Sequence, residues 1–196
     1  MTDAQEPADD DAAESRNGDR GEMPAWKNPA YRFVFLFLVY LGAIAYGYPK
    51  FRERYIGAVD ALAEATAYFE YLAFSVFTTQ ITHSQKVVAY KGFAVHIIEE
   101  CTGVYEVLIF SAAVLAFPTV WSKKLVGFGL GIPILYLFNV LRIAVLIVVG
   151  KHAPQYFDFM HLYFWQATLI LMITSVWLLW ITQVVNRDWS RTTADP

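Results

Sequence analysis

The chain has 196 residues, of which 57% are hydrophobic, and its mean hydropathy is +0.38. A soluble domain is about 45–50% apolar, so this composition excludes an ordinary soluble protein and indicates an integral membrane protein. The formal net charge of −3 says little about partners, because the charges are segregated along the chain. The one cysteine, Cys101, excludes an internal disulfide and any cysteine-based zinc or iron–sulfur site. We therefore expect no cofactor and no metal, and we expect no nucleic-acid partner.

The N-terminal 1–28 is rich in Asp and Glu and poor in apolar residues, so we expect a disordered acidic tail. It lacks the basic start and short apolar core of a cleavable signal peptide, so the first hydrophobic segment is expected to stay in the protein.

Four long apolar segments follow this tail, and each meets the requirement of about 20 apolar residues for crossing a bilayer. The predicted helices cover 29–48, 102–121, 125–149 and 161–182. Together they define a transmembrane domain over 29–182, followed by a C-terminal tail over 183–196, which we expect in the cytoplasm.

The segment 56–78 is ambiguous. Asp60 and Glu64 lie one turn apart on one helical face, which suits an amphipathic helix in the membrane interface. Its second half carries only Glu70, so a membrane crossing is equally compatible. The sequence therefore predicts four or five transmembrane helices.

A β-hairpin is predicted between this segment and Cys101. Residues 86–90 and 93–98 are rich in Val, Tyr, Phe and Ile and flank a Lys91–Gly92 turn. Open strand edges are not tolerated in lipid, so the hairpin must lie outside the bilayer. The expected fold is an all-α polytopic membrane protein with a short extracytoplasmic β-hairpin before the Cys helix.

The basic residues predict the orientation. Lysines 123–124 and the pair Arg187 and Arg191 flank alternate ends of the last three helices, which places these ends in the cytoplasm. Cys101 and His161 then lie on the outer side. We expect a multi-pass protein of the cell (inner, cytoplasmic) membrane, in contact with lipid, whose active site faces the extracytoplasmic side.

Three reactive residues therefore belong to three successive helices and lie toward one membrane face. Arg142 lies roughly 12 Å deep, at 1.5 Å per residue, and a buried arginine in a membrane helix is a candidate functional residue, unless it snorkels to the surface. Cys101 and His161 form a nucleophile and base if they lie within reach. Arg142 would then stabilise a thiolate, an oxyanion or a substrate carboxylate.

Each of these residues also has a structural interpretation. A single cysteine is commonly a packed thiol, and His161 could be a polar residue at a helix end. His96 or His152 could serve as the base instead, because both lie toward the outer side. His83 is expected in an exposed loop.

The ordered motifs resemble those of the exosortase/archaeosortase family, over about 85–182. They are Cys101-Thr102-Gly103 after a hairpin, Asn139-Val140-Leu141-Arg142 within a helix, and His161 at the next helix. The short length suggests a compact member of that family.

The resemblance implies a membrane cysteine transpeptidase. Cys101 would be the nucleophile, His161 the acid/base and Arg142 the electrostatic stabiliser, while Asn139 would orient Arg142. Thr102 and Gly103 would be supporting residues. The implied partners are exported proteins with a C-terminal motif, a transmembrane helix and a basic tail, which are cleaved and transferred to an envelope acceptor.

Two other functions remain open at this point. A membrane cysteine peptidase would use water as the acceptor. A non-enzymatic assembly or transport subunit would use Arg142, paired with Glu106 or Glu100, to fasten its helices together.

Overall fold

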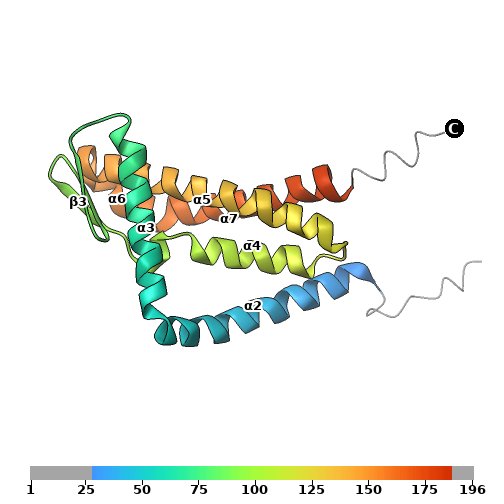
Figure 1. The fold of residues 1–196 in the computed structure, drawn as a ribbon. Coiled ribbons are helices and arrows are strands. Elements are labelled where there is room, and N and C mark those ends of the chain that lie inside the picture. The colour runs from blue at the N-terminus through green and yellow to red at the C-terminus, as the bar shows by residue number, and fades with distance from the viewer. Residues whose placement is uncertain (1–27, 187–196) are drawn as a thin grey trace, which may run out of the picture.

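The computed structural model describes residues 28–186. The predicted acidic tail, apart from Asn28, and the basic pair Arg187 and Arg191 lie outside these residues. Four helical segments run along one another and a fifth helix crosses one end of them, beside a small sheet (Figure 1). The predicted all-α membrane fold is confirmed. Three described helices are long and apolar enough to span a bilayer and a fourth apolar helix is shorter.

Helix α2, Pro29–Arg54, begins where predicted. The Asn28 side chain accepts a hydrogen bond from the Ala30 amide at 2.9 Å, and Pro29 occupies the first helical position, where its missing N–H does no harm. The helix continues past residue 48 and carries Arg52 and Arg54 in its last turn, where positive charge complements the helix dipole.

Helix α3, Ile56–Ser75, resolves the ambiguity over 56–78. It lies across the end of the bundle rather than along it (Figure 1), and it is not among the helices that qualify as spans. Its buried face, which includes Ala67 and Glu70, packs on α5 and the sheet. The arrangement supports the interfacial interpretation and four crossings. The basic end of α2 then lies at the same end of the bundle as Cys101.

The predicted hairpin is confirmed, and a third strand precedes it. Strands β1 (Ile81–Ser84), β2 (Val87–Tyr90) and β3 (Phe93–His96) form an antiparallel sheet in that order. Lys91 and Gly92 both have positive φ, 48° and 83°, as a two-residue turn of this hand requires. The expectation that His83 lies in an exposed loop is wrong, because it is a half-buried residue of β1 packed near Tyr68 and Tyr71.

Three segments complete the bundle. Helix α4, Val104–Ala116, is shorter than predicted, and Trp121 belongs instead to α5, Trp121–His152. The last helical run comprises η3 (Pro154–Tyr156), α6 (Phe157–Phe159), η4 (Met160–Phe164), α7 (Trp165–Trp180) and η5 (Ile181–Val185). It begins before residue 161 and ends after residue 182.

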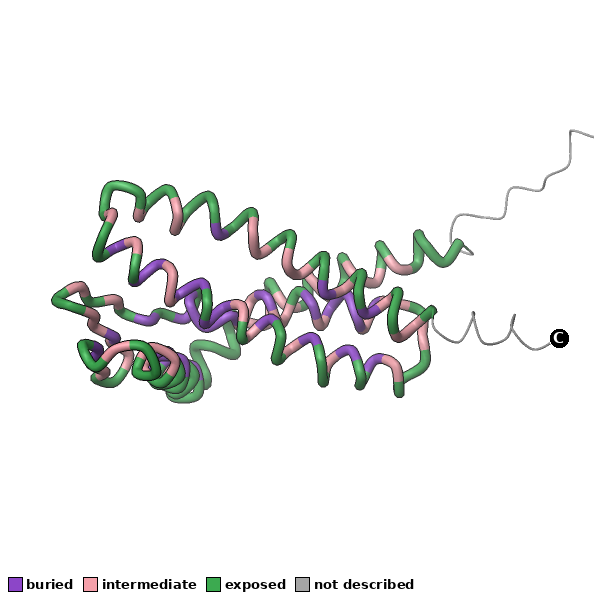
Figure 2. Tube along the Cα trace, turned by 90° about the horizontal axis from the view of Figure 1, so that it is seen from above, coloured by how far each residue is buried: buried purple, intermediate pink, exposed green. Residues whose placement is uncertain are grey.

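Buried residues gather where the helices face one another, and the outer sides are exposed (Figure 2). Those outer sides carry large apolar residues, including Phe35, Leu137 and Leu171, which are 67%, 70% and 67% exposed. Such a surface suits lipid rather than water.

Two glycines of α5 allow this close packing. A Cβ atom on Gly131 would overlap the ring of the fully buried Phe110 of α4, and one on Gly127 would lie 2.7 Å from Nε1 of Trp180. That Nε1 instead donates a hydrogen bond to the Lys123 carbonyl at 2.9 Å. These glycines are therefore packing residues.

We expect Gly131→Ala to destabilise the protein by about 1–3 kcal/mol, because the added Cβ would force the fully buried Phe110 ring to shift. Gly129→Ala is the matched control, since a Cβ atom on Gly129 would meet nothing within 4 Å. Thermal unfolding in detergent should show a lower midpoint for Gly131→Ala only. Equal midpoints would contradict the proposed close contact.

The orientation expected from the basic residues predicts which sites label from outside the cell. Ser84 ends β1 and Ser122 lies in the first turn of α5, and both are exposed. The sheet and the start of α5 lie at opposite ends of the bundle (Figure 1). In a Cys101→Ala background, an impermeant maleimide added to intact cells should label Ser84→Cys and not Ser122→Cys. The reverse pattern would place the sheet in the cytoplasm.

Candidate active site

Cys101 lies in a tight turn between the sheet and α4. It ends the 3-10 helix η2, Glu99–Cys101, and its amide donates to the Ile98 carbonyl at 2.9 Å. The Thr102 hydroxyl and amide both donate to the Glu99 carbonyl, at 2.7 and 3.0 Å. Thr102 thereby closes the turn that holds the cysteine.

Gly103 redirects the chain into α4. Its φ is +78°, which glycine adopts without the steric cost that a side chain would bring. A Cβ atom there would also lie 3.3 Å from the Asn139 side chain. Backbone conformation and space therefore both favour glycine at this position.

Asn139 connects α5 to the cysteine turn. Its Nδ2 donates a hydrogen bond to the Cys101 carbonyl at 2.7 Å, and its side chain is buried. The sequence suggested that Asn139 orients Arg142, but the hydrogen bond in the structure goes to Cys101. Asn139 Oδ1 is buried without a hydrogen-bond partner among the described residues.

Arg142 is buried inside the bundle, with 7% of the residue exposed, rather than extended to the outer surface. Its Nη1 lies 3.8 Å from Oε1 of Glu106 on α4, whose side chain is also buried. Arg142 Nε and Glu106 Oε2 have no hydrogen-bond partner among the described residues. The pair is loose, and the guanidinium keeps donors for another group.

His161 lies in the π-helical segment η4, within a continuous helical run, and not at the start of a helix as predicted. Its ring stacks on Phe157, with centroids 5.7 Å apart, and its Nδ1 is buried without a partner among the described residues. The charges of Arg142 and Asp158 both act on the imidazole. Single π-turns inside helices are frequent at functional sites.

Arg142 is the predicted site residue whose charge reaches the other two. The charge of Arg142 acts on the Cys101 thiol as well as on His161. Among the alternative bases, His152 is exposed at the end of α5, with Nδ1 3.1 Å from the Val148 carbonyl. His96 is exposed on β3 and lines a pocket beside the cysteine turn.

Burial raises the pKa of the Cys101 thiol above its usual value. Arg142 lowers this pKa, but Glu100 and Glu106 raise it. The thiol is therefore neutral in the resting protein near pH 7, and a nearby base has to remove its proton before or during attack.

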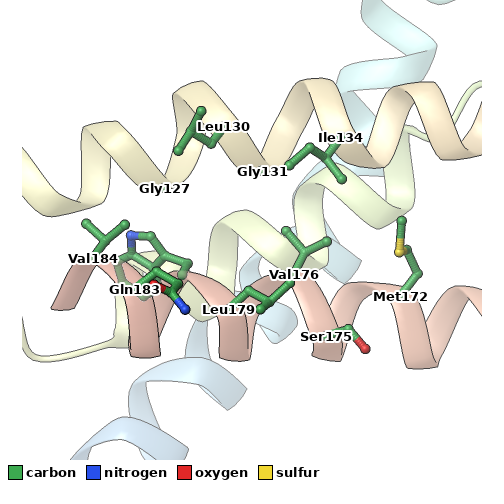
Figure 3. Close-up of a pocket in the computed structure, with 11 residues that line it drawn as sticks. Gly127, Leu130, Gly131, Ile134, Met172, Ser175, Val176, Leu179, Gln183 and Val184 are labelled. Atoms are coloured by element: carbon green, nitrogen blue, oxygen red, sulfur yellow. The ribbon is translucent and has the colours of Figure 1, made fainter. Parts of the chain in front are cut away.

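Two hollows differ in chemistry. A pocket of about 240 Å³ beside the cysteine turn is lined by charged and polar residues, including Arg52, Lys86, His96, Glu99 and Glu100. A groove of about 340 Å³ between α5 and α7 is lined by residues such as Leu130, Ile134 and Val176 and has no titratable lining residue (Figure 3). The polar pocket reaches Glu99 and Glu100 of the cysteine turn, but Cys101, Arg142 and His161 line neither hollow.

Several contributors were missed by sequence reasoning. Arg52 and Tyr105 both contact Glu99, two residues before Cys101. Asp158 precedes His161 by three positions, a helical spacing that could have indicated its influence. Arg52 is distant in the sequence, so no local signal connects it to the cysteine.

The electrostatics make the protonation of Cys101 depend on Arg142. We expect Arg142→Gln to raise the pKa of the thiol further, because it removes the cation that favours the thiolate. Alkylation by neutral iodoacetamide from pH 6 to 10 reports this residue alone, since the chain has one cysteine. The pH midpoint should move up in Arg142→Gln, stay near wild type in Arg142→Lys, and not move in the control Lys86→Gln. An unchanged midpoint in Arg142→Gln would contradict the interaction.

Comparison with known proteins places this geometry in a family. The family model described as transmembrane exosortase matches residues 25–181, which include the cysteine turn, Arg142 and His161. No curated protein and no solved structure matches the chain. The chain belongs to the transmembrane exosortase family.

Proposed function

We propose that the protein is a membrane cysteine transpeptidase that cleaves the C-terminal sorting signals of exported proteins and transfers the acyl group to an envelope acceptor. One observation carries the proposal: Cys101 and His161, from separate helices, both lie under the influence of the buried Arg142 guanidinium. Arg142 Nε and His161 Nδ1 are buried with no partner among the described residues. Unpaired polar atoms cost free energy when buried, and a bound substrate could supply their partners.

The first half-reaction follows from the neutral thiol. His161 takes the thiol proton while the sulfur of Cys101 attacks the scissile carbonyl and a C–S bond forms. Arg142 stabilises the negative charge that develops on the carbonyl oxygen. The C–N bond then breaks, His161 returns the proton to the leaving amine, and a thioester remains on Cys101.

The second half-reaction determines the product. An acceptor amine attacks the thioester, His161 takes its proton, and the thiol re-forms as the new amide is released. If water attacks instead, the product is a free carboxylate and the protein is a cysteine peptidase. The dependence of the product on the acceptor separates these two possibilities.

One observation favours a non-enzymatic role. The predicted pairing of Arg142 with Glu106 is present and joins α4 to α5. A contact of 3.8 Å that leaves Arg142 Nε and Glu106 Oε2 unpartnered among the described residues is a weak fastening, however. The loose geometry fits an arginine that serves a substrate better than one that only joins helices.

The proposed setting is the extracytoplasmic side of the cell membrane. The partners in this proposal are exported proteins that carry a short C-terminal motif, a transmembrane helix and a basic tail. The cysteine turn contacts α3 at the end of the bundle where the sheet also lies (Figure 1), which suits a cleavage site just outside the lipid.

Covalent catalysis predicts that Cys101→Ser abolishes processing while the protein still accumulates in the membrane, because a hydroxyl is a far weaker nucleophile than a thiolate. Wild type should form a substrate adduct that hydroxylamine releases and that Cys101→Ala lacks. His161→Ala should slow both the formation and the breakdown of the adduct, since the imidazole then deprotonates neither the thiol nor the acceptor. Mass spectrometry of the mature C-terminus identifies the acceptor.

Each alternative function has its own outcome in this experiment. A mature product that carries only a free carboxylate under all acceptor conditions would favour the peptidase. Normal processing by Cys101→Ala would refute both enzymatic functions and leave the assembly subunit.

A further inference from the structure

The Glu99 carboxylate is held from two helices. Its Oε2 lies 2.7 Å from Nε of Arg52 at the end of α2, and its Oε1 accepts a hydrogen bond from the Tyr105 hydroxyl of α4 at 2.7 Å. The charge of this carboxylate also acts on the Tyr48 hydroxyl of α2, and the Tyr48 ring packs edge-on against Tyr105 with centroids 5.2 Å apart. We call Arg52, Glu99, Tyr105 and Tyr48 the Glu99 clamp.

The same residue holds the cysteine turn through its backbone. The Glu99 carbonyl accepts from both the amide and the hydroxyl of Thr102, so the chain closes around Cys101. On the far side, Asn139 of α5 holds the Cys101 carbonyl at 2.7 Å. The clamp thus fixes one side of the turn to α2 and α4, while Asn139 fixes the other side to α5.

The Glu99 carboxylate is buried beside the cysteine turn, and its charge is compensated by neighbouring groups. Only 8% of the Glu99 side chain is exposed, and a buried carboxylate has to be compensated by partners. The charges that act most on the Cys101 thiol are those of Arg142, Glu100 and Glu106. Because Arg52 neutralises it, Glu99 can act through geometry without opposing the thiolate.

We propose that Glu99 is a positioning residue, which through the Glu99 clamp holds the cysteine turn so that the sulfur of Cys101 faces Arg142 and His161. This inference rests on the proposed role of Cys101 as the nucleophile. Misplacement of a nucleophile by even about 1 Å can lower a rate by about 10²-fold, so a rigid turn matters more to turnover than to folding.

The neighbouring residue provides a matched control. Glu99→Gln and Glu100→Gln each remove one negative charge, but only the first weakens the clamp, because Glu100 is exposed and its side chain takes no part in it. Glu100 also raises the pKa of the thiol, so a purely electrostatic effect would be at least as large in Glu100→Gln.

The experiment measures substrate processing, alkylation of the single thiol and thermal stability in the full-length protein. Glu99→Gln should lower processing by at least about tenfold, which corresponds to about 1.4 kcal/mol in the barrier. It should also speed alkylation of Cys101 at high pH, where the thiolate is fully formed, because the released turn is more accessible. Glu100→Gln should instead shift the pH midpoint of alkylation downward and leave the high-pH rate near wild type.

A second variant separates positioning from folding. Tyr105→Phe keeps the ring and removes one hydrogen bond to Glu99, so it should give a smaller change in the same direction. Combined with Glu99→Gln it should add little, because both act through one clamp. If Glu99→Gln lowers processing only in proportion to lost folded protein, or matches Glu100→Gln in all three measurements, the positioning role is refuted.

Failure of the proposed function would look different. Alkylation needs no substrate, so it tests the clamp even if the reaction has been misassigned. Normal processing of substrate by Cys101→Ala would refute the assignment of Cys101 as the nucleophile. If Glu99→Gln processes substrate and is alkylated like wild type while Cys101→Ala is inactive, the positioning role of Glu99 is refuted. The role of Cys101 as the nucleophile would then still stand.

Discussion

The burial of Arg142 inside a helical membrane bundle is the constraint on which the site depends. A guanidinium cannot be neutralised by losing its proton, so it needs acceptors or counter-charges where it lies. Glu106 supplies one at 3.8 Å, which is too far for a hydrogen bond, and Arg142 Nε is left without a partner among the described residues. A bundle that served only stability would satisfy this cation better. The incomplete pairing makes its charge available to Cys101 and His161.

A second buried ionisable group, the carboxyl group of Glu70, lies in α3. Glu70 is fully buried, neither carboxylate oxygen has a hydrogen-bond partner among the described residues, and burial raises its pKa to about 8. The folded protein therefore holds a proton that the unfolded chain releases near the ordinary pKa of 4.5. The contribution of Glu70 to stability is greatest below that value and falls as the pH rises toward about 8. The docking of α3 over the bundle end thus weakens as the pH rises from about 4.5 to about 8.

The sequence predicted the features that depend on local patterns. Hydrophobic runs indicated the spanning helices, and the Lys91–Gly92 turn indicated the hairpin, because two residues with positive φ are a local requirement. The residues Cys101, Arg142 and His161 were identified from their common membrane face. Contacts between distant segments could not be predicted in this way. The orientation of α3 depends on which face packs against α5, and the partner of Glu99 comes from the end of α2.

The acidic residues around Cys101 can be reconciled with a reactive thiol. Glu100 and Glu106 favour the neutral form, and burial does so more strongly. A standing thiolate would be attacked by oxidants and electrophiles, whereas a neutral, buried thiol is comparatively inert. In the proposed mechanism the proton leaves only when His161 can accept it and Arg142 can stabilise the charge on the substrate. In this mechanism the thiol is a weak nucleophile in the free protein and becomes reactive only when substrate is bound. The geometry of the cysteine turn therefore matters more than the pKa of the thiol.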